Sequence, residues 1–259
     1  MFLYFVILGL IVGSFLSAYT YRAPLDIPIS KGRSLCPNCK NLINWYDNIP
    51  VFSFLFLHGK CRNCHKKISP RYPIIELSTA IIFTLVYLNM PLINANISWA
   101  ADLPYMLYTI FYILIATLCL TVIITDLEHQ IILDNIVFTG FFTTLFLLIL
   151  KNPDLLFHQL LASFFSAFLL LSLNLITRGK GMGMGDVKFA LFAGLVFGLK
   201  LALAWLFLAF ILGSIIGIIL IIVDHKKLKT KIAFGPFLAL SFYIFMFYGH
   251  LLTQFIFPI

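Results

Sequence analysis

The stretch LALAWLFLAFILGSIIGIILIIV, residues 201–223, contains no charged side chain. A helix of roughly 20 apolar residues crosses the ~30 Å hydrocarbon core of a bilayer. The chain is 61% hydrophobic and only 11% charged, which is far outside the usage of globular proteins. We therefore predict an all-α polytopic membrane protein with about eight transmembrane helices. The other uncharged runs are 1–21, 77–101, 103–125, 135–150, 155–177, 189–199 and 232–259. The run 189–199 is the shortest and must include Lys188 and the preceding glycines to span.

The distribution of basic residues predicts the orientation of these helices. If the spans alternate, every one of the 18 Lys and Arg residues except Lys151 and Lys200 falls on one side. The positive-inside rule makes that side cytoplasmic, with both termini outside. The first run has no basic segment before it, so we expect a retained helix rather than a cleaved signal peptide. The net charge of +8 follows from this topology and from contact with membrane lipid, and nucleic acid is not an expected partner.

One sizeable polar segment interrupts the apolar runs, at residues 22–73, between the first and second predicted spans. The predicted organisation is a first transmembrane helix at 1–21, a small cytoplasmic lobe at 22–73, and a bundle of seven helices at 74–259.

The lobe contains two CxxC pairs, CPNC at 36–39 and CRNC at 61–64. This spacing is typical of paired zinc knuckles, in which four thiolates complete a tetrahedron. Two disulfides are the alternative, which a reducing cytosol disfavours. A lobe of ~50 residues is also too small for a self-sufficient core. His58 and His65 flank the second pair as alternative ligands. We expect a structural Zn²⁺ bound by Cys36, Cys39, Cys61 and Cys64, with no open position for water.

Several carboxylates abut or enter apolar runs, where a charge is costly and is normally kept for function. The predicted topology places Asp126 at the inner end of the third span and Asp186 at the inner start of the sixth. Two carboxylates brought close together share a proton and can act as acid and base on an amide. Asp134 competes for this role, and it would lie about two helical turns deeper if the fourth span started near His129. The spacing does not decide between them. Glu76, at the start of the second span, is the remaining carboxylate of this kind.

The stretch GMGMGDVK, residues 181–188, places Asp186 directly after three glycines. Gly181, Gly183 and Gly185 let the backbone turn sharply and let another chain approach closely. The free amides of a helix's first turn favour a nearby carboxylate. Flexibility here would also admit an extended substrate segment. The alternatives are a plain interhelical loop and GxxxG helix packing through Gly181 and Gly185.

A series of motifs then indicates a family. In chain order they are GSFLSAYTYRAP (13–24), CPNC, INWYDNIPVFSFLFLHGKCRNC (43–64), ISPRYPIIELSTA (68–80), TDLEHQIILDNI (125–136), GMGDVK (183–188) and FGPFLA (234–239). In these motifs, over nearly its whole length, the chain resembles the type IV prepilin leader peptidases, also called prepilin peptidase/N-methyltransferases, which are GxGD membrane aspartyl proteases. It departs from the family pattern at Ser17, where Asn is usual, and at Leu133, where Pro is common.

The resemblance implies site residues. It makes Asp126 and Asp186 the two catalytic aspartates and gives Asp134 the role of supporting the start of the fourth helix. Gly183 and Gly185 would leave room for substrate. Lys188 would bias proton affinities near Asp186 or simply extend to the membrane surface. Glu76 would orient the lobe or the cofactor, or form a salt link to Arg71.

The resemblance also implies two activities in the cytoplasmic (inner) membrane of a bacterium. The first is removal of a short basic leader from type IV prepilins or pseudopilins at the cytoplasmic face. The second is methylation of the new N-terminal residue with S-adenosylmethionine, whose binding residues the sequence does not indicate. By the resemblance, the region around Ser17, where the chain departs from the family pattern, is associated with methyl transfer.

Three other functions remain to be compared with this one. A proton-coupled transporter would place its acids near the bilayer midplane and show a repeat between halves, whereas these acids cluster at one face and the halves differ. A non-catalytic, zinc-dependent assembly factor for a pilus or secretion machine would not need the aspartates for prepilin processing. A peptidase without methyl transfer would keep only the first activity. The sequence does not indicate an oligomeric state.

Overall fold

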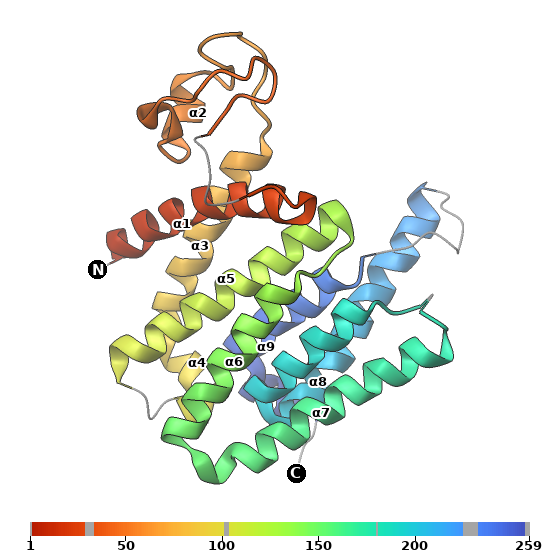
Figure 1. The fold of residues 1–259 in the computed structure, drawn as a ribbon. Helices are drawn as coiled ribbons and strands as arrows, with labels where there is room; N and C mark the ends of the chain where they lie inside the picture. Colours follow the sequence, from red (N-terminus) through yellow and green to blue (C-terminus); the bar gives the residue numbers. More distant parts are fainter. Residues whose placement is uncertain (1, 29–33, 101–103, 180, 225–232, 257–259) are drawn as a thin grey trace. The chain divides into compact units, whose positions relative to one another are not determined.

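A computed structural model describes the chain apart from residues 1, 29–33, 101–103, 180, 225–232 and 257–259. Within the described residues the regular structure is helical, with two isolated β-bridges and no strand (Figure 1). The predicted all-α fold is therefore confirmed. The chain forms two compact units, Met1–Leu88 and Asn89–Ile259. This division groups the second predicted span with the first, whereas the sequence analysis placed it in the bundle 74–259.

The first unit is built on two long helices, α1 (Phe2–Arg22) and α3 (Arg71–Leu88). They pack closely because two glycines, four residues apart on α1, face α3. A Cβ added to Gly9 would lie 2.5 Å from Cα of Ala80, and one added to Gly13 would lie 2.7 Å from Cα of Glu76. Small residues at this spacing let two membrane helices approach to backbone contact. The sequence analysis did not identify this pair.

The polar lobe lies between these two helices in the sequence. It contains the short 3₁₀ helices η1 (Ala23–Leu25) and η2 (Trp45–Asn48) and one short α-helix, α2 (Phe52–Phe56). In the described residues 34–70 the only side chain that is fully buried is Cys36. The lobe therefore has almost no hydrophobic core, as its length predicted.

The second unit contains the remaining helices. They are α4 (Met90–Asn96), η3 (Ser98–Ala100), α5 (Tyr105–His129), α6 (Asp134–Lys151), α7 (Pro153–Ile176), α8 (Met184–Asp224) and α9 (Gly235–Ile256).

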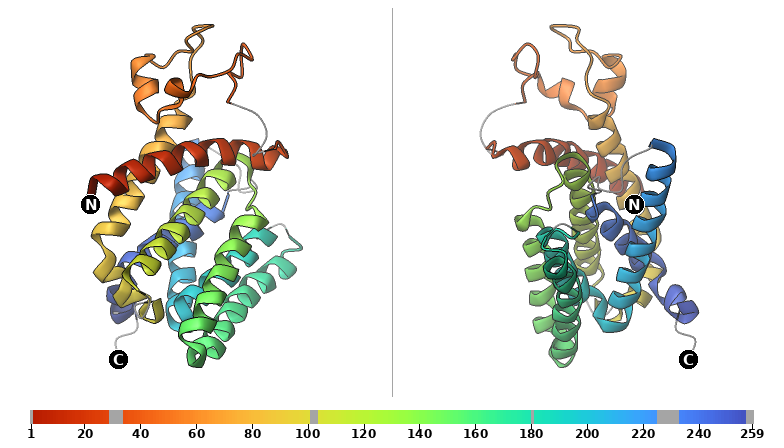
Figure 2. Two further views of the ribbon diagram at one scale, coloured as in Figure 1. Left: turned by 60° about the vertical axis from the view of Figure 1, so that its left-hand side comes forward. Right: turned by 90° about the vertical axis from the view of Figure 1, so that its right-hand side faces the viewer.

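The described residues include six helices that are long and apolar enough to cross a membrane, and a shorter apolar helix at Gly235–Gly249. One of the six, α8, is two helices joined at Gly198, whose backbone is non-helical (φ 74°, ψ 172°). The chain reverses direction there, as the two views in Figure 2 show. Thus α8 contains both the sixth and the seventh predicted spans, and α9 lies in the eighth. The chain is a multi-pass membrane protein. Most of the basic loop predicted at 224–231 lies outside the described residues.

An aromatic core fixes α8 against α9. The rings of Phe192 and Phe242 are stacked with centroids 5.6 Å apart, and Phe189 meets Phe242 edge to face at 6.0 Å. Trp205, on the second half of α8, donates its indole N–H to the carbonyl of Leu238 at 2.9 Å. Because these side chains are buried, the two halves of α8 and the start of α9 form one rigid support.

Candidate active site and metal centre

Asp126 lies in the last turns of α5 and is buried, with 6% of its surface exposed. Its Oδ2 accepts a hydrogen bond from the backbone N–H of Gly235 at 2.8 Å. Gly235 is the first residue of α9, so this carboxylate lies at the positive end of a helix dipole. The main chain is fixed as well, because Gln130 is left-handed (φ 55°) and donates its N–H to the Asp126 carbonyl at 3.0 Å.

Asp186 lies in the first turn of α8, two residues after its start at Met184, and is 7% exposed. Its Oδ2 accepts a hydrogen bond from the backbone N–H of Gly183 at 3.0 Å. A carboxylate in the third helical position that reaches back to the residue before the helix is half of a capping box. The sequence therefore folds here so that Asp186 stabilises the start of its own helix.

The two carboxylates are close enough for their like charges to interact. Ile132, which is buried, contacts the helix starts on both sides. A Cβ added to Gly185 would lie 2.8 Å from its Cβ, and one added to Gly235 would lie 3.1 Å from its Cδ1. The same Cβ on Gly235 would lie 2.6 Å from Oδ2 of Asp126. The starts of α8 and α9 therefore meet the end of α5 at a distance that only glycine allows.

The glycines of GMGMGD have different roles from one another. The left-handed backbone of this connection lies at Arg178 and Gly179 (φ 51° and 73°), and the chain bends again at residues 181–182 just before α8. Gly185 serves close approach, as expected. Gly181 precedes α8 and Gly185 lies within it. The two do not share a helix, and the GxxxG alternative is therefore wrong.

Asp134 has a different environment from the buried pair. It is the first residue of α6, so the condition under which it would lie two turns deeper, a helix start near His129, is not met. The resemblance had put Asp134 at the start of the fourth helix, which is its position in the structure. Its Oδ1 pairs with Nζ of Lys188 at 2.6 Å, and the two side chains are 55% and 34% exposed. The ion pair joins the start of α6 to the start of α8. Leu133, where the family usually has Pro, has φ −71°, which is the value that proline would fix.

Glu76 lies on α3 and is 7% exposed. Its Oε2 accepts a hydrogen bond from the backbone N–H of Val51 at 2.7 Å, and Ser14 on α1 also bonds to this carboxylate. Val51 precedes α2 and has a positive φ of 61°, which is rare and strained for a β-branched residue. Glu76 therefore links Val51, the strained residue that precedes α2, to the helices α1 and α3.

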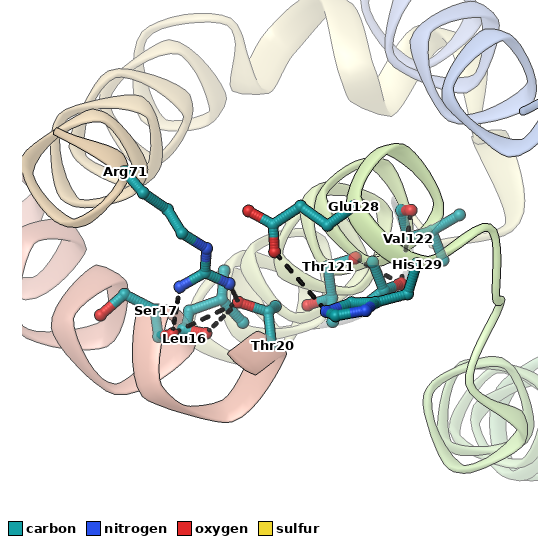
Figure 3. Close-up of polar contacts among 9 residues, drawn as sticks. Leu16, Ser17, Thr20, Arg71, Thr121, Val122, Glu128 and His129 are labelled. Carbon is teal, nitrogen blue, oxygen red and sulfur yellow. Dashed lines mark hydrogen bonds and ion pairs between the residues drawn. The ribbon is translucent and has the colours of Figure 1, made fainter. Parts of the chain in front are cut away.

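Arg71 binds α1. Its guanidinium donates to the carbonyl of Ser17 and to Oγ1 of Thr20, both at 2.7 Å (Figure 3). Ser17 and Thr20 are buried. The sequence analysis considered Arg71 only as a partner of Glu76 and missed its contacts with α1.

The two CxxC pairs form equivalent turns. In each, the first cysteine accepts a hydrogen bond at 2.9 Å from the residue after the second cysteine, and that residue is left-handed. The flanking residues then form an antiparallel bridge, Leu35 to Leu42 and Lys60 to Lys67. His65 occupies the left-handed position of its turn, as Lys40 does in the first. Both turns have the geometry that presents two thiols on one side.

The four thiols come together at one point. The Sγ atoms of Cys36, Cys39, Cys61 and Cys64 all lie within 4.8 Å of one another, and none forms a disulfide. Backbone hydrogen bonding, chiefly from Cys39, lowers the pKa of the Cys36 thiol to about 6, which favours the thiolate that a metal requires. The cluster can hold a metal ion with all four ligands supplied by cysteine. Among the described residues no histidine belongs to it.

Two residues of this site were not identified as such from the sequence. Gly235 was quoted only as part of FGPFLA, and Ile132 was not considered. A Gly-Pro pair that opens an apolar run is the one available signal, since Pro is favoured in the first turn of a helix and glycine permits close approach before it.

The fold and the site define a class of protein: a multi-pass helical membrane protein with a buried pair of carboxylates and a separate four-cysteine lobe. Comparison with known proteins identifies the family. Residues 112–222 match the type IV leader peptidase family, and residues 7–90 match the bacterial peptidase A24 N-terminal domain. The chain belongs to the type IV leader peptidase family, which confirms the resemblance seen in its motifs.

Curated relatives match over almost the whole chain. A prepilin leader peptidase/N-methyltransferase of Vibrio cholerae is 32% identical, covering 94% of this chain and 95% of its own length. Relatives with the same description from Bacillus subtilis and Pseudomonas aeruginosa are 30% and 28% identical, each over 96% of this chain and over 95% and 91% of their own lengths. No solved structure gives a significant match.

Proposed function

We propose that this protein is an aspartic endopeptidase that removes the leader from type IV prepilins or pseudopilins, with Asp126 and Asp186 as its catalytic residues. One observation carries the proposal. Two buried carboxylates from α5 and α8 are each fixed through Oδ2 by the backbone N–H of a glycine at a helix start, and both helix starts contact Ile132. The names of the relatives supply the substrate class.

Two neighbouring buried carboxylates cannot both be ionised without strong repulsion between their charges, so the pair shares one proton. The ionised member takes a proton from water as the water oxygen attacks the scissile carbonyl carbon. The protonated member donates its proton to the carbonyl oxygen. In the collapse of the gem-diol adduct the C–N bond breaks, and the carboxyl that took the proton from water gives it to the departing nitrogen. The other carboxylate takes a proton from a hydroxyl of the adduct as the new carbonyl forms, which restores the shared proton of the pair. Because Oδ2 of each aspartate is held by a backbone N–H, Oδ1 is left for water and substrate.

Substrate enters as extended chain, because a helical peptide bond is sterically shielded. Gly181 and Gly183 lie ahead of α8 and are exposed, and neither has a side chain to obstruct a substrate backbone. We infer that the lobe and the aspartates face the cytoplasm at a bacterial inner membrane, because the positive-inside rule favours that side for the basic residues. A basic leader would be found on the same side.

The four cysteines would hold Zn²⁺. Cysteine thiolates in a closed set are the ligands of structural zinc, and a fourth cysteine leaves no position for a catalytic water. The metal would therefore cross-link the two turns of the lobe and take no part in hydrolysis.

The second proposed activity is methylation of the new N-terminal residue, with S-adenosylmethionine as methyl donor. The relatives' names support it. We assign no residues to binding of this cofactor.

The test uses the purified protein in lipid with a prepilin-like substrate, with product masses read with and without S-adenosylmethionine. We expect wild type to remove the leader, and Asp126→Asn and Asp186→Asn each to slow cleavage by about 10³-fold or more, because loss of an acid or base commonly costs 10²–10⁴. The matched control is Asp154→Asn, an exposed acid in the first turn of α7, which should cleave as wild type does.

The outcomes separate the alternatives. An added methyl mass on the new N-terminus supports the second activity, and its absence with a competent substrate leaves a peptidase alone. Cleavage that survives both substitutions contradicts the assignment and returns Asp134 to consideration. If no form cleaves a competent substrate, an assembly factor explains the family membership better.

A further inference from the structure

The lobe exposes large apolar side chains on one face of its short helix α2. Phe52, Leu55 and Phe56 occupy positions i, i+3 and i+4 of α2 and are 54%, 62% and 79% exposed. Residues at this spacing share one side of a helix. Phe54 points elsewhere, since its ring lies 3.2 Å from the position that a Cβ on Gly59 would occupy. The apolar face is therefore presented outward while another phenylalanine of the same helix packs within the lobe.

The exposed face continues onto η2, which packs against α2. Trp45 is 78% exposed and Tyr46 is 44% exposed, with their rings 5.7 Å apart and nearly perpendicular. We call the five residues Trp45, Tyr46, Phe52, Leu55 and Phe56 the aromatic surface. The guanidinium of Arg62 lies 5.3 Å from the Tyr46 ring and pairs with Asp47 at 2.6 Å, so a fixed cation borders this surface.

The lobe has many more basic residues than acidic ones. Asp47 is the only acidic residue in the described range 34–70, and it is paired with Arg62. The basic residues of the same range are Lys40, Lys60, Arg62, Lys66 and Lys67. Any partner of the aromatic surface must therefore accept exposed apolar rings on a lobe with a large excess of positive charge.

We propose that the aromatic surface docks on the anionic face of the lipid bilayer. Tryptophan and tyrosine prefer the membrane–water interface, and aromatic rings combined with lysines are the signature of segments that lie on anionic lipid. The lobe is joined directly to α1 and α3, and both are helices able to span. It is therefore held within reach of the bilayer surface. The proposal adds an interaction to the proposed peptidase function and does not depend on it.

Charge argues against the other occupants. A basic prepilin leader would be repelled by the positive charge of the lobe, and a second copy of the lobe would present the same positive charge. An anionic lipid surface is complementary in charge and provides the apolar layer that the rings require.

Tryptophan fluorescence of the full-length protein in lipid nanodiscs tests the proposal. Of the three tryptophans, Trp99 and Trp205 are buried (3% and 0% exposed), so quenching from outside reports mainly on Trp45. Subtracting the fluorescence of the Trp45→Phe variant from that of the wild-type protein gives the contribution of Trp45. The two quenchers are acrylamide in water and a lipid brominated near the headgroup.

In phosphatidylglycerol nanodiscs we expect acrylamide quenching of Trp45 to fall several-fold relative to phosphatidylcholine, and quenching by brominated lipid to rise. High salt should reverse part of the change, because it screens the lysines. Lys66→Gln with Lys67→Gln should lower the docked-to-free ratio roughly tenfold, since each basic residue contributes separately to attraction by anionic lipid. The control Lys151→Gln with Lys200→Gln makes the same change in charge outside the lobe and should leave the docked-to-free ratio unaltered.

Two results would overturn the proposal. If Trp45 is equally open to acrylamide in both lipids, the surface faces water. If it is shielded from both quenchers, a protein covers it, either a second copy or another part of this chain. Retention of metal by each lysine variant shows that the lobe is still folded.

Discussion

The cysteine lobe and the helical bundle are stabilised by different means. In residues 34–70 only Cys36 is fully buried, and the aromatic side chains Trp45 and Phe56 are 78% and 79% exposed. In the bundle Phe189, Phe192, Phe242 and Trp205 are buried and packed together. A short polar segment cannot bury enough apolar surface to fold by itself, whereas long apolar helices can. The lobe therefore depends on its ligand set, and the bundle on its packing.

Removal of the metal should produce the largest effect and should sharpen this contrast. We expect a chelator, or Cys36→Ser with Cys61→Ser, to unfold the lobe, because a structural zinc commonly contributes on the order of 10 kcal/mol to folding. Limited proteolysis at Lys60, Lys66 and Lys67 should become fast while the helices of the bundle stay intact. Cys119→Ala, which changes a buried cysteine of α5, should leave metal content unchanged. A lobe that resists protease without metal would contradict this account.

Substitution in the bundle should have the opposite pattern. Gly235→Ala places a Cβ 2.6 Å from Oδ2 of Asp126, and so must displace the carboxylate or the start of α9. A misplacement of this size can cost about 10²-fold in kcat. Metal content should not change. Gly213→Ala is the matched control. A Cβ at Gly213 would lie 3.2 Å from the edge of the Phe234 ring, and this ring can shift. Equal activity of the two variants would show that the contact at Gly235 does not position the aspartate.

Glu76→Gln tests the attachment of the lobe to α3. The charged hydrogen bond to Val51 N–H is replaced by a neutral one, and bonds to charged groups are worth about 1.5–3 kcal/mol against roughly 1 for neutral ones. We expect the Val51 amide to exchange its hydrogen about tenfold faster or more, with the melting temperature of the bundle unchanged. Glu128→Gln, an exposed acid at the end of α5, is the control. Unchanged exchange at Val51 would remove Glu76 from this role.

The ion pair of Asp134 and Lys188 should matter least. Both side chains are partly exposed, so the pair is worth about 0–1 kcal/mol. We expect Asp134→Asn or Lys188→Met to lower kcat by less than about tenfold, and the exchange Asp134→Lys with Lys188→Asp to restore part of the loss. Loss of all cleavage in Asp134→Asn would mean that this carboxylate, and not one of the buried pair, does the chemistry.

The sequence predicted those features that local spacing determines. Two CxxC pairs predicted the cysteine cluster, because each turn is encoded within a few residues. The apolar runs predicted the helices, including the reversal that Gly198 provides within α8. Counting spans put Asp126 and Asp186 at one membrane depth, which stays a prediction.

Features that depend on packing between distant segments were not predicted. The N–H of Gly235 meets Asp126 across more than a hundred residues, and nothing near either residue encodes this. The apolar pattern alone did not decide whether the fourth span starts near His129 or at Asp134, because residues 131–133 continue the pattern without being helical. Similarly, Gly181 and Gly185 match a packing motif in sequence, yet the helix begins between them.

The central claim, that Asp126 and Asp186 act as one catalytic unit, is tested most directly by the cleavage rate of the double variant Asp126→Asn/Asp186→Asn beside the two single variants. Groups that act as a unit give strongly non-additive losses. We predict that each single variant falls to the same residual rate and that the double variant falls no further. Losses that add, or a rate that survives in either single variant, would contradict the claim.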